Sequence, residues 1–420
     1  MTEDVSTTGH LTIRTVGAMD EFDADAWNAC ADASSAAYHP FQRHAFLAAL
    51  EASGSAVAER GWKPLHIALE DDDGALVGCA AAYLKAHSQG EYIFDHAWAD
   101  AFHRAGGRYY PKLLVAVPFT PATGPRLLAR DGNGIDAAGA RDALVQGIVQ
   151  VASELEISSA HLNFTTRAEH ERLGELGLLQ RVDQQFHWLN AGYASFDEFL
   201  ADLASKKRKN LKRERREACS AGIEIEWITG SDLREYHWDA FHAFYEDTGS
   251  RKWGSPYLTR RFFSLVGEAM ADDILLILCR RGGRYIAGAL NFIGGDTLYG
   301  RHWGCLEDHR FLHFETCYYQ AIDFAISRGL ARVEAGAQGG HKVARGYVPA
   351  ETYSAHWIGH PGLREAVGDY LDRERGWVRD DISQVERHTP FRSDVAIDDL
   401  RARAVRPDAA DRTADDGGGD

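Results

Sequence analysis

Cysteine is sparse in this chain of 420 residues: there are six, scattered, and no two form a Cys-x-x-Cys pair. The sequence therefore favours neither a zinc ribbon nor a disulfide framework, and its cysteine use is ordinary for a reducing cytosol. No run approaches about eighteen uninterrupted apolar residues, and residues 1–10 lack the apolar stretch of a signal peptide. We therefore expect a cytoplasmic protein with no membrane span.

The usual signatures of nucleotide and metal sites are also missing. The sequence has no Walker loop, no Gly-x-Ser-x-Gly elbow and no dinucleotide fingerprint. His309/His313 and His356/His360 have the spacing of helical ligand pairs, but no cysteine or carboxylate ligand set accompanies either pair. We expect no metal site and no tightly bound cofactor.

The chain is long enough for two domains, and 45% of its residues are apolar, as in a packed globular protein. We place an N-terminal domain at residues 11–192 and a C-terminal domain at 195–392. Residues 404–420 are rich in aspartate, alanine, arginine and glycine, which predicts a disordered acidic tail.

One supersecondary pattern occurs twice. Two apolar segments joined by a glycine-containing turn predict a β-hairpin at residues 64–84 and another at 274–293. Each hairpin is followed later by a segment with helical apolar spacing and then a short strand. The helices are expected at 142–155 and 314–327, and the strands at 160–164 and 332–335. The sequence thus predicts two α/β domains of similar design.

A strongly basic segment stands out in a chain whose net charge is −16: eight of the eleven residues from 206 to 216 are lysine or arginine. On a helix, Lys206, Lys209, Arg213 and Arg216 share one stripe, and leucines and alanines gather on the opposite side. Three interpretations stay open, namely a solvated surface, a site for an anionic substrate, and a nucleic-acid contact, which the acidic overall charge disfavours.

The glycine-rich stretch at residues 334–347 is the richest candidate for chemistry. Acyl transfer to an amine requires a proton acceptor, donors to the developing oxyanion and cations for any phosphate. Glu334 or His341 fits the first role, and Lys342 and Arg345 fit the last. Further substrate-binding candidates are Gln338 and Tyr347. The alternative is a glycine-rich loop whose charges lie on the surface.

A second cluster contains Arg301, His302 and Trp303, followed by His313 at the start of the second predicted helix. If the strands of this half are neighbours, His313 comes near the loop after Glu334. We therefore name Glu334, His341 and His313 as catalytic candidates, and Arg301, His302 and Trp303 as substrate-binding ones. The alternative for His313 is a packing role.

Several short sequence segments resemble those of a known family. They are His39-Pro40-Phe41, Tyr109-Tyr110-Pro111-Lys112, Val117-Pro118-Phe119-Thr120-Pro121, Gln185-Phe186-His187-Trp188 and the stretch from Glu334 to Lys342. Over residues 11–387 the chain resembles the FemAB-like "peptidoglycan biosynthesis/recognition" group of N-acyltransferases. The repeated pattern is similar to the GNAT superfamily and to its tandem, Fem-type members. The resemblance implies two GNAT-like domains, each a mixed, mostly antiparallel sheet flanked by helices, with the chemistry in the second.

The resemblance also implies the reaction and its substrates. It suggests transfer of an acyl or aminoacyl group to an amine-bearing acceptor, such as a cell-wall precursor, with acyl-CoA or aminoacyl-tRNA as donor. In the GNAT pyrophosphate loop, Arg301 and Gly304 match but Leu306 stands where a small residue is expected, which weakens the case for CoA. The alternative function is a non-catalytic module that recognises a peptidoglycan fragment or nucleic acid.

Overall fold

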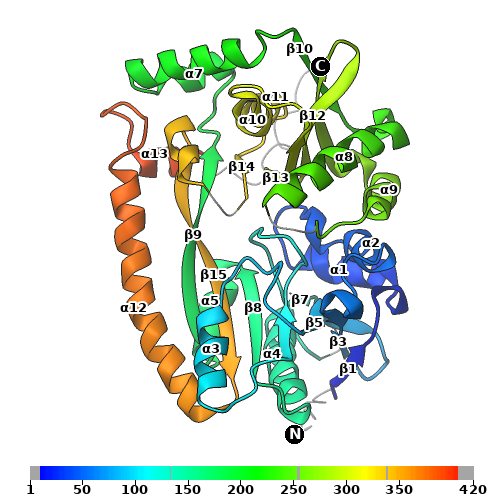
Figure 1. Cartoon of the computed structure of the whole chain (residues 1–420). Helices are drawn as coiled ribbons and strands as arrows, with labels where there is room; N and C mark the ends of the chain where they lie inside the picture. Colours follow the sequence, from blue (N-terminus) through cyan, green and yellow to red (C-terminus); the bar gives the residue numbers. More distant parts are fainter. Residues whose placement is uncertain (1–9, 133, 253–255, 337–338, 405–420) are drawn as a thin grey trace, which may run out of the picture.

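The computed structural model describes residues 10–132, 134–252, 256–336 and 339–404, and shows two α/β halves stacked on one another (Figure 1). We call residues 10–192 the N-terminal half and residues 195–404 the C-terminal half. Gln338 and residues 405–420 of the expected tail lie outside the described residues.

The N-terminal half contains nine strands and five α-helices among its described residues. The strands are β1 (Thr12–Val16), β2 (Trp62–Pro64), β3 (His66–Glu70), β4 (Leu76–Ala80), β5 (Ala82–Lys85), β6 (Lys112–Val115), β7 (Leu128–Ala129), β8 (Ser159–Thr165) and β9 (Leu179–Leu189). The helices are α1 (Ala24–Ala33), α2 (His44–Ala52), α3 (His96–Arg104), α4 (Ala137–Glu154) and α5 (Arg167–Glu175).

The C-terminal half is likewise built of strands and helices. Its strands are β10 (Ile223–Ile228), β11 (Ile274–Arg281), β12 (Arg284–Ile293), β13 (Thr297–Cys305), β14 (Arg332–Glu334) and β15 (Val348–Ile358). Its α-helices are α6 (Phe196–Ala201), α7 (Ser205–Ala218), α8 (Glu235–Lys252), α9 (Arg260–Ala269), α10 (Leu312–Phe314), α11 (Gln320–Ser327), α12 (Pro361–Glu386) and α13 (Ile397–Ala404). A π-helical turn, η6 (Glu315–Tyr319), joins α10 to α11, and a 3-10 helix, η7 (Gly340–Arg345), follows β14.

The predicted repeat is confirmed. β3 and β4 form one antiparallel hairpin and β11 and β12 the other. In the second hairpin, Gly282 and Gly283 have φ of 56° and 78°, left-handed values that favour glycine in a tight turn. Each half also has one parallel pair, β6 with β8 and β13 with β14. The expected strand at 76–84 differs, because it breaks at Ala81 into β4 and β5, which belong to different sheets.

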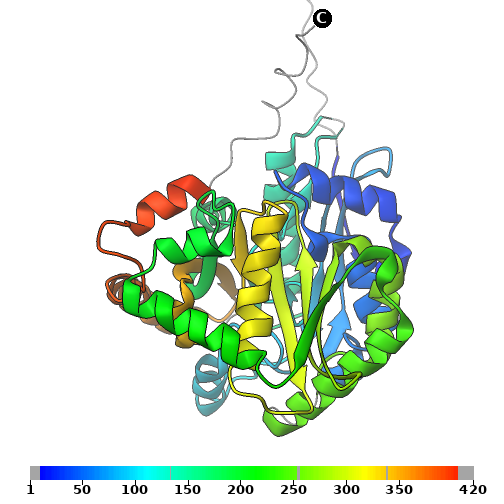
Figure 2. The ribbon, with the colours of Figure 1, turned by 90° about the horizontal axis from the view of Figure 1, so that it is seen from above.

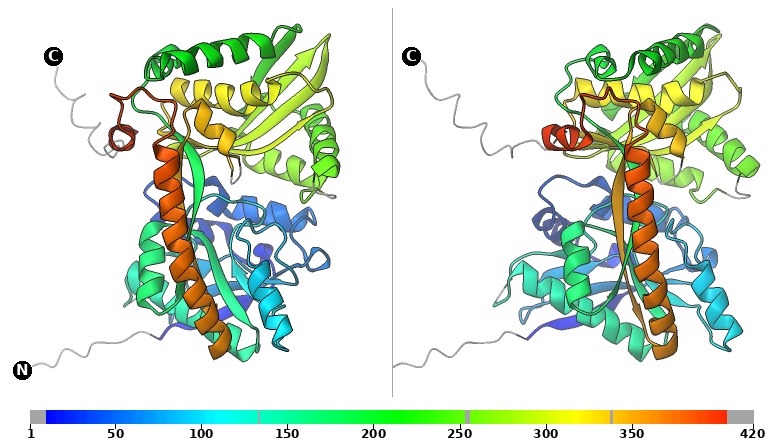
Figure 3. Two further views of the ribbon diagram at one scale, coloured as in Figure 1. Left: turned by 60° about the vertical axis from the view of Figure 1, so that its left-hand side comes forward. Right: turned by 90° about the vertical axis from the view of Figure 1, so that its left-hand side faces the viewer.

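The two halves exchange strands. β9, from the N-terminal half, pairs with β14, and β15, from the C-terminal half, pairs with both β9 and β8. A sheet of eleven strands therefore runs through both halves, in the order β10-β11-β12-β13-β14-β9-β15-β8-β6-β5-β2. A sheet of four strands, β1-β3-β4-β7, completes the N-terminal half. The long helix α12 runs beside β9 and β15 (Figure 3).

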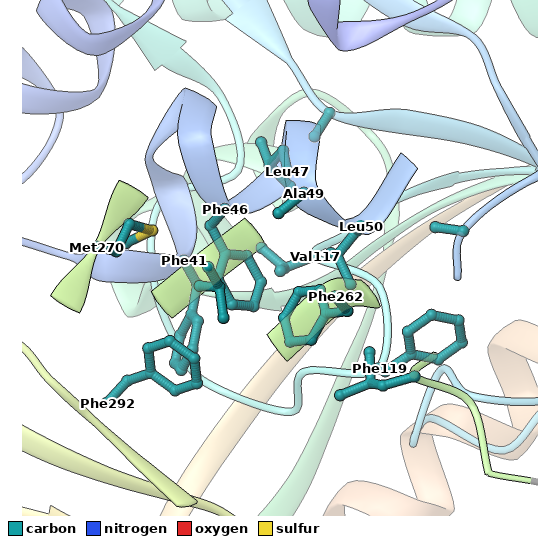
Figure 4. Packing of buried hydrophobic residues seen from close by; sticks show 14 of the residues in the cluster. Phe41, Phe46, Leu47, Ala49, Leu50, Val117, Phe119, Phe262, Met270 and Phe292 are labelled. Carbon is teal, nitrogen blue, oxygen red and sulfur yellow. The ribbon is translucent and has the colours of Figure 1, made fainter. Parts of the chain in front are cut away.

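Buried side chains hold the layers together. α11 lies against the sheet of the C-terminal half, with α7 beside it (Figure 2). A separate aromatic cluster joins the halves: the ring of Phe46 on α2 lies 5.7 Å from Phe262 on α9, and Phe41 lies 5.1 Å from Phe292 on β12 (Figure 4). Such pairs add packing energy to the apolar area that they bury.

Candidate functional site

The site begins where two parallel strands separate. β13 and β14 pair only through Thr297–Tyr299 and Arg332–Glu334. β14 then ends, whereas β13 continues to Cys305 with β12 on its other side. Residues 300–305 of β13 therefore have no β14 partner. The Cys305 N–H donates to the Thr248 hydroxyl at 3.4 Å, and along residues 300–304 no β14 strand stands in the way of an extended ligand.

A cavity of about 430 Å³ lies along this edge of β13, and we call it the β13 cavity. Its walls come from β12, β13, α10, η6 and the loop after β14. Five predicted site residues line it together: Arg301, His302, Trp303, His313 and His341. The volume lies in the range of small-molecule sites.

His341 and His313 lie close together in this cavity. The Tyr318 hydroxyl is hydrogen-bonded to His341 Nε2 at 2.8 Å, and the ring centroids of His341 and His313 are 6.1 Å apart. The ring of Trp303 lies 5.3 Å from that of His313. Burial raises the pKa of Tyr318 well above its ordinary value. Tyr318 is therefore a neutral phenol near pH 7 and orients the imidazole of His341.

Arg301 lies at the inner end of the cavity. Its guanidinium donates a hydrogen bond to the Phe119 carbonyl, in the N-terminal half. Burial lowers the pKa of Arg301. The adjacent His302 is neutral at pH 7, because burial lowers its pKa to about 3. Arg301 is thus the cation that this cavity offers to a ligand.

Glu334 lies in a second polar cluster, between the halves. Its side chain is 6% exposed, and its carboxylate oxygens lie 3.6 Å from Arg332 Nε and 4.0 Å from His187 Nε2. Burial raises the pKa of Glu334 to about 7, against the opposing influence of Arg332. Its neighbour Ala335 lines the β13 cavity, whereas Glu334 itself is not part of the cavity wall. Of the three catalytic candidates, His341 and His313 line the β13 cavity and Glu334 does not.

The other residues of the loop hold it in place. Lys342 is buried and donates to the Gly336 carbonyl at 2.7 Å, and burial lowers its pKa to about 8. Arg345 donates to the His341 carbonyl at 2.7 Å and to Glu214 at 2.9 Å. Tyr347 is fully buried. These three side chains are not part of the wall of the β13 cavity.

The basic helix α7 lies outside the cavity, above α10 and α11 in Figure 1. Lys206, Lys209, Arg213 and Arg216 are exposed. Arg215 instead turns inward and pairs with the buried Glu315 at 2.9 Å. The predicted cationic stripe is therefore a surface feature beside the site and does not line the β13 cavity.

Sequence reasoning missed three residues of this region. Tyr318, which orients His341, reads in the sequence as a core aromatic of a helix. Arg126 is buried between the halves, where its guanidinium donates to several backbone carbonyls, and its isolated position in the chain gave no signal. His187 lies in a phrase that marked the family resemblance, but only the pairing of β9 with β14 places it beside Glu334.

No helix of the described part of the chain is long and apolar enough to cross a membrane. Nor do the described ranges contain a group of three or more histidine, cysteine, aspartate or glutamate side chains suited to a metal ion.

Comparison with known proteins places the chain in a family. No curated protein matches it. Among solved structures, the C-terminal domain of a putative lysylphosphatidylglycerol synthetase from Agrobacterium fabrum is 9% identical, with 84% of this chain and 96% of that chain covered and a TM-score of 0.50. FemX is 14% identical, with 76% and 93% covered and a TM-score of 0.48. A tandem GNAT protein from the clavulanic acid biosynthesis pathway is 12% identical, with 84% and 99% covered and a TM-score of 0.44. The FemAB-like family model, described as peptidoglycan biosynthesis/recognition, matches residues 18–393, and the chain belongs to this family.

Proposed function

We propose that this protein is an N-acyltransferase that moves an acyl or aminoacyl group onto the amine of a cell-wall precursor. The observation that carries the proposal is the β13 cavity, where an edge of β13 that β14 leaves, three histidines and an arginine meet. Membership of a peptidoglycan biosynthesis/recognition family supports a cell-wall acceptor.

The reaction needs a group that removes a proton from the attacking amine. In the proposed step the amine lone pair attacks the donor's carbonyl carbon, the C–N bond forms, and the bond from that carbon to the donor's leaving atom breaks. His341 accepts the ammonium proton and returns it to the leaving atom, while Tyr318 holds the imidazole in place. His313 and Glu334 are the other proton acceptors that we propose, and Glu334 would act through a water.

The carbonyl oxygen of the donor gains negative charge during this attack. Arg301 and backbone N–H groups of residues 300–303, which line the cavity on the edge that β14 leaves, are the donors that we propose for this oxygen. Fixed donors of this kind stabilise the transition state most when water is excluded from the site. His302 and Trp303 form the adjoining wall and help to shape the space that receives the donor's acyl group.

The donor is acyl-CoA or aminoacyl-tRNA, and neither needs a tightly bound cofactor. The exposed stripe of Lys206, Lys209, Arg213 and Arg216 on α7 offers a polyanionic donor a contact next to the cavity. We propose that Lys342, Arg345 and Tyr347 act indirectly, by fixing the loop that carries His341.

A mass-spectrometric assay tests the proposal. The protein is incubated with a muropeptide that has a free amine, together with acyl-CoAs or aminoacyl-tRNAs, and we expect a product heavier by the acyl group. His341→Gln should lower turnover by about 10²–10⁴-fold. The matched control His103→Gln, on the exposed face of α3, should keep full turnover. No product with any donor, or full turnover in His341→Gln, would contradict the proposal.

A further inference from the structure

One acidic residue interrupts the basic segment of α7. Of the eleven residues from 206 to 216, only Glu214 carries a carboxylate. Its side chain is largely buried, whereas the adjacent Arg213 is exposed. Residues three and four positions apart share one face of a helix, and Leu211 and Ala218, which share a face with Glu214, are buried. Glu214 therefore points inward, away from the cationic stripe.

A single carboxylate oxygen of Glu214 joins α7 to two elements of the cavity wall. Glu214 Oε2 accepts a hydrogen bond from Arg345 Nη2 at 2.9 Å and another from the Tyr319 hydroxyl. Burial, together with this hydrogen bond, raises the pKa of Tyr319 well above its ordinary value, so the phenol is neutral near pH 7 and acts as the donor. Tyr319 ends η6, which carries Tyr318, and Arg345 ends η7, which carries His341.

Both links lead to His341. Arg345 donates to the His341 carbonyl at 2.7 Å through Nη1, the other terminal nitrogen of the guanidinium that Glu214 holds. The Tyr318 hydroxyl is hydrogen-bonded to His341 Nε2 at 2.8 Å, and Tyr318 directly precedes Tyr319 in the π-helical turn. Turns of this kind are rare and are frequent at functional sites. The backbone of His341 is therefore held through Arg345, and its imidazole through the turn that Tyr319 anchors.

The segment that carries His341 depends on such anchors. Gly339 and Gly346 flank η7 with φ of 111° and 87°, values that favour glycine, and glycine leaves the backbone more freedom than other residues do. The Arg345 guanidinium lies over the Phe314 ring, 3.4 Å from its centroid, and Glu214 is the carboxylate that pairs with it. Without that carboxylate a buried charge loses its counter-charge, which is costly, so Arg345 should move together with the segment that it holds.

We propose that Glu214 is a positioning residue, which fixes His341 in the β13 cavity by holding Arg345 and Tyr319. Glu214 is not among the described residues that line the cavity, so it acts through these two side chains. This inference rests on the proposed function, in which His341 accepts the proton of the attacking amine. It also accounts for the acidic residue in the basic segment. One helix presents lysine and arginine to a polyanionic donor on its outer side and holds the proton acceptor on its inner side.

NMR of the His341 ring tests the assignment without any substrate. The full chain is labelled with 15N in its histidine rings, and His341→Gln identifies the signals of His341 by their loss. In Glu214→Ala we expect both ring-nitrogen shifts of His341 to move towards those of a free imidazole, because the hydrogen bond to Tyr318 is no longer fixed. Alanine favours a helix, so α7 itself is retained. Glu214→Gln, whose amide oxygen still accepts hydrogen bonds, should give a smaller change in the same direction.

Glu374→Ala on α12 is the matched control. Glu374 pairs with Arg181 at 2.7 Å, and these side chains are 13% and 9% exposed, against 13% and 7% for Glu214 and Arg345. The control therefore removes a similarly buried ion pair but should leave the His341 signals unchanged. Unchanged His341 signals in Glu214→Ala, or an equal change in Glu374→Ala, would overturn the proposal. Thermal unfolding checks that each variant is folded, and if Glu214→Ala is not, Glu214→Gln decides in the same way.

Turnover separates this inference from the proposed function. If the wild type transfers an acyl group, Glu214→Ala should lower kcat by about 10²-fold, as a misplacement of about 1 Å can, and leave the KM of both substrates unchanged. A raised KM with an unchanged kcat would overturn the positioning role. If the wild type shows no acyl transfer but its His341 signals change in Glu214→Ala, the link from Glu214 to His341 is upheld and the proposed reaction is contradicted.

Discussion

Glu334→Gln changes one buried carboxyl group into a neutral amide of the same shape. The Glu334 side chain is 6% exposed, and burial raises its pKa from 4.5 to about 7 although Arg332 favours the charged form. Between these two pH values the folded protein holds a proton that the unfolded chain has lost. The free energy of unfolding should therefore fall as the pH rises through this window.

The size of the effect follows from the pKa. At about 1.4 kcal/mol per pKa unit, ionising Glu334 in the folded state costs about 3 kcal/mol above pH 7. This stability is fully present below pH 4.5 and is lost as the pH rises through about 7. The amide of Glu334→Gln does not ionise. The variant should therefore gain up to about 3 kcal/mol relative to the wild type between pH 4.5 and pH 8.

Urea unfolding of both proteins at pH 4.5, 6 and 8 measures this difference. The exposed Glu365 on α12 provides the control: Glu365→Gln should change the stability by less than about 0.5 kcal/mol at every pH. If the difference in free energy of unfolding between Glu334→Gln and the wild type is the same at all three pH values, the reasoning is refuted. If Glu334 also takes part in proton transfer, turnover of Glu334→Gln should fall by about 10²–10⁴-fold.

Two other substitutions test the packing around the site. Arg215→Ala removes the ion-pair partner of Glu315, whose side chain is 2% exposed, and should lower the free energy of unfolding by about 3 kcal/mol. Arg216→Ala, on the same helix, is the control and should change it by less than about 0.5 kcal/mol in urea unfolding. Equal effects of the two substitutions would contradict an anchoring role for Arg215. Gly304→Ala places a Cβ 2.2 Å from the Phe244 carbonyl oxygen and should lower the free energy of unfolding by about 1–3 kcal/mol. The control Gly376→Ala, on α12, has no atom within reach of the added Cβ and should leave the thermal stability unchanged or raise it. A fully stable Gly304→Ala would show that α8 and β13 are less closely packed than described.

Local patterns were sufficient to predict the repeated elements. The apolar segments give β11, β12 and β14 close to their observed bounds, because these short elements are buried. The helix expected at 314–327 is found as the π-helical turn η6 followed by α11, and the sequence pattern did not indicate this irregularity. The basic segment is likewise the helix α7, with Leu211 and Ala218 buried on its inner side.

Long-range pairing could not be predicted from the same patterns. The break at Ala81 depends on which strands lie beside β4 and β5, and the exchange of β9 and β15 joins residues more than 150 positions apart. The same limit applies to the site. Arg301, His302 and His313 were predicted in one cluster and His341 in another, and all four line one cavity. The position of Glu334 depends on the pairing of β14 with β9.

Hydrogen exchange with and without donor tests the central claim most directly. If the donor binds along the free edge of β13, acyl-CoA or aminoacyl-tRNA should slow exchange of the backbone amides at residues 300–305 and 339–345, which form or border the β13 cavity. The amides of α3, far along the chain from this cavity, should exchange at an unchanged rate. Protection of residues 300–305 by one donor class would support the account and name the donor. No protection there by either class at near-saturating concentration would contradict it.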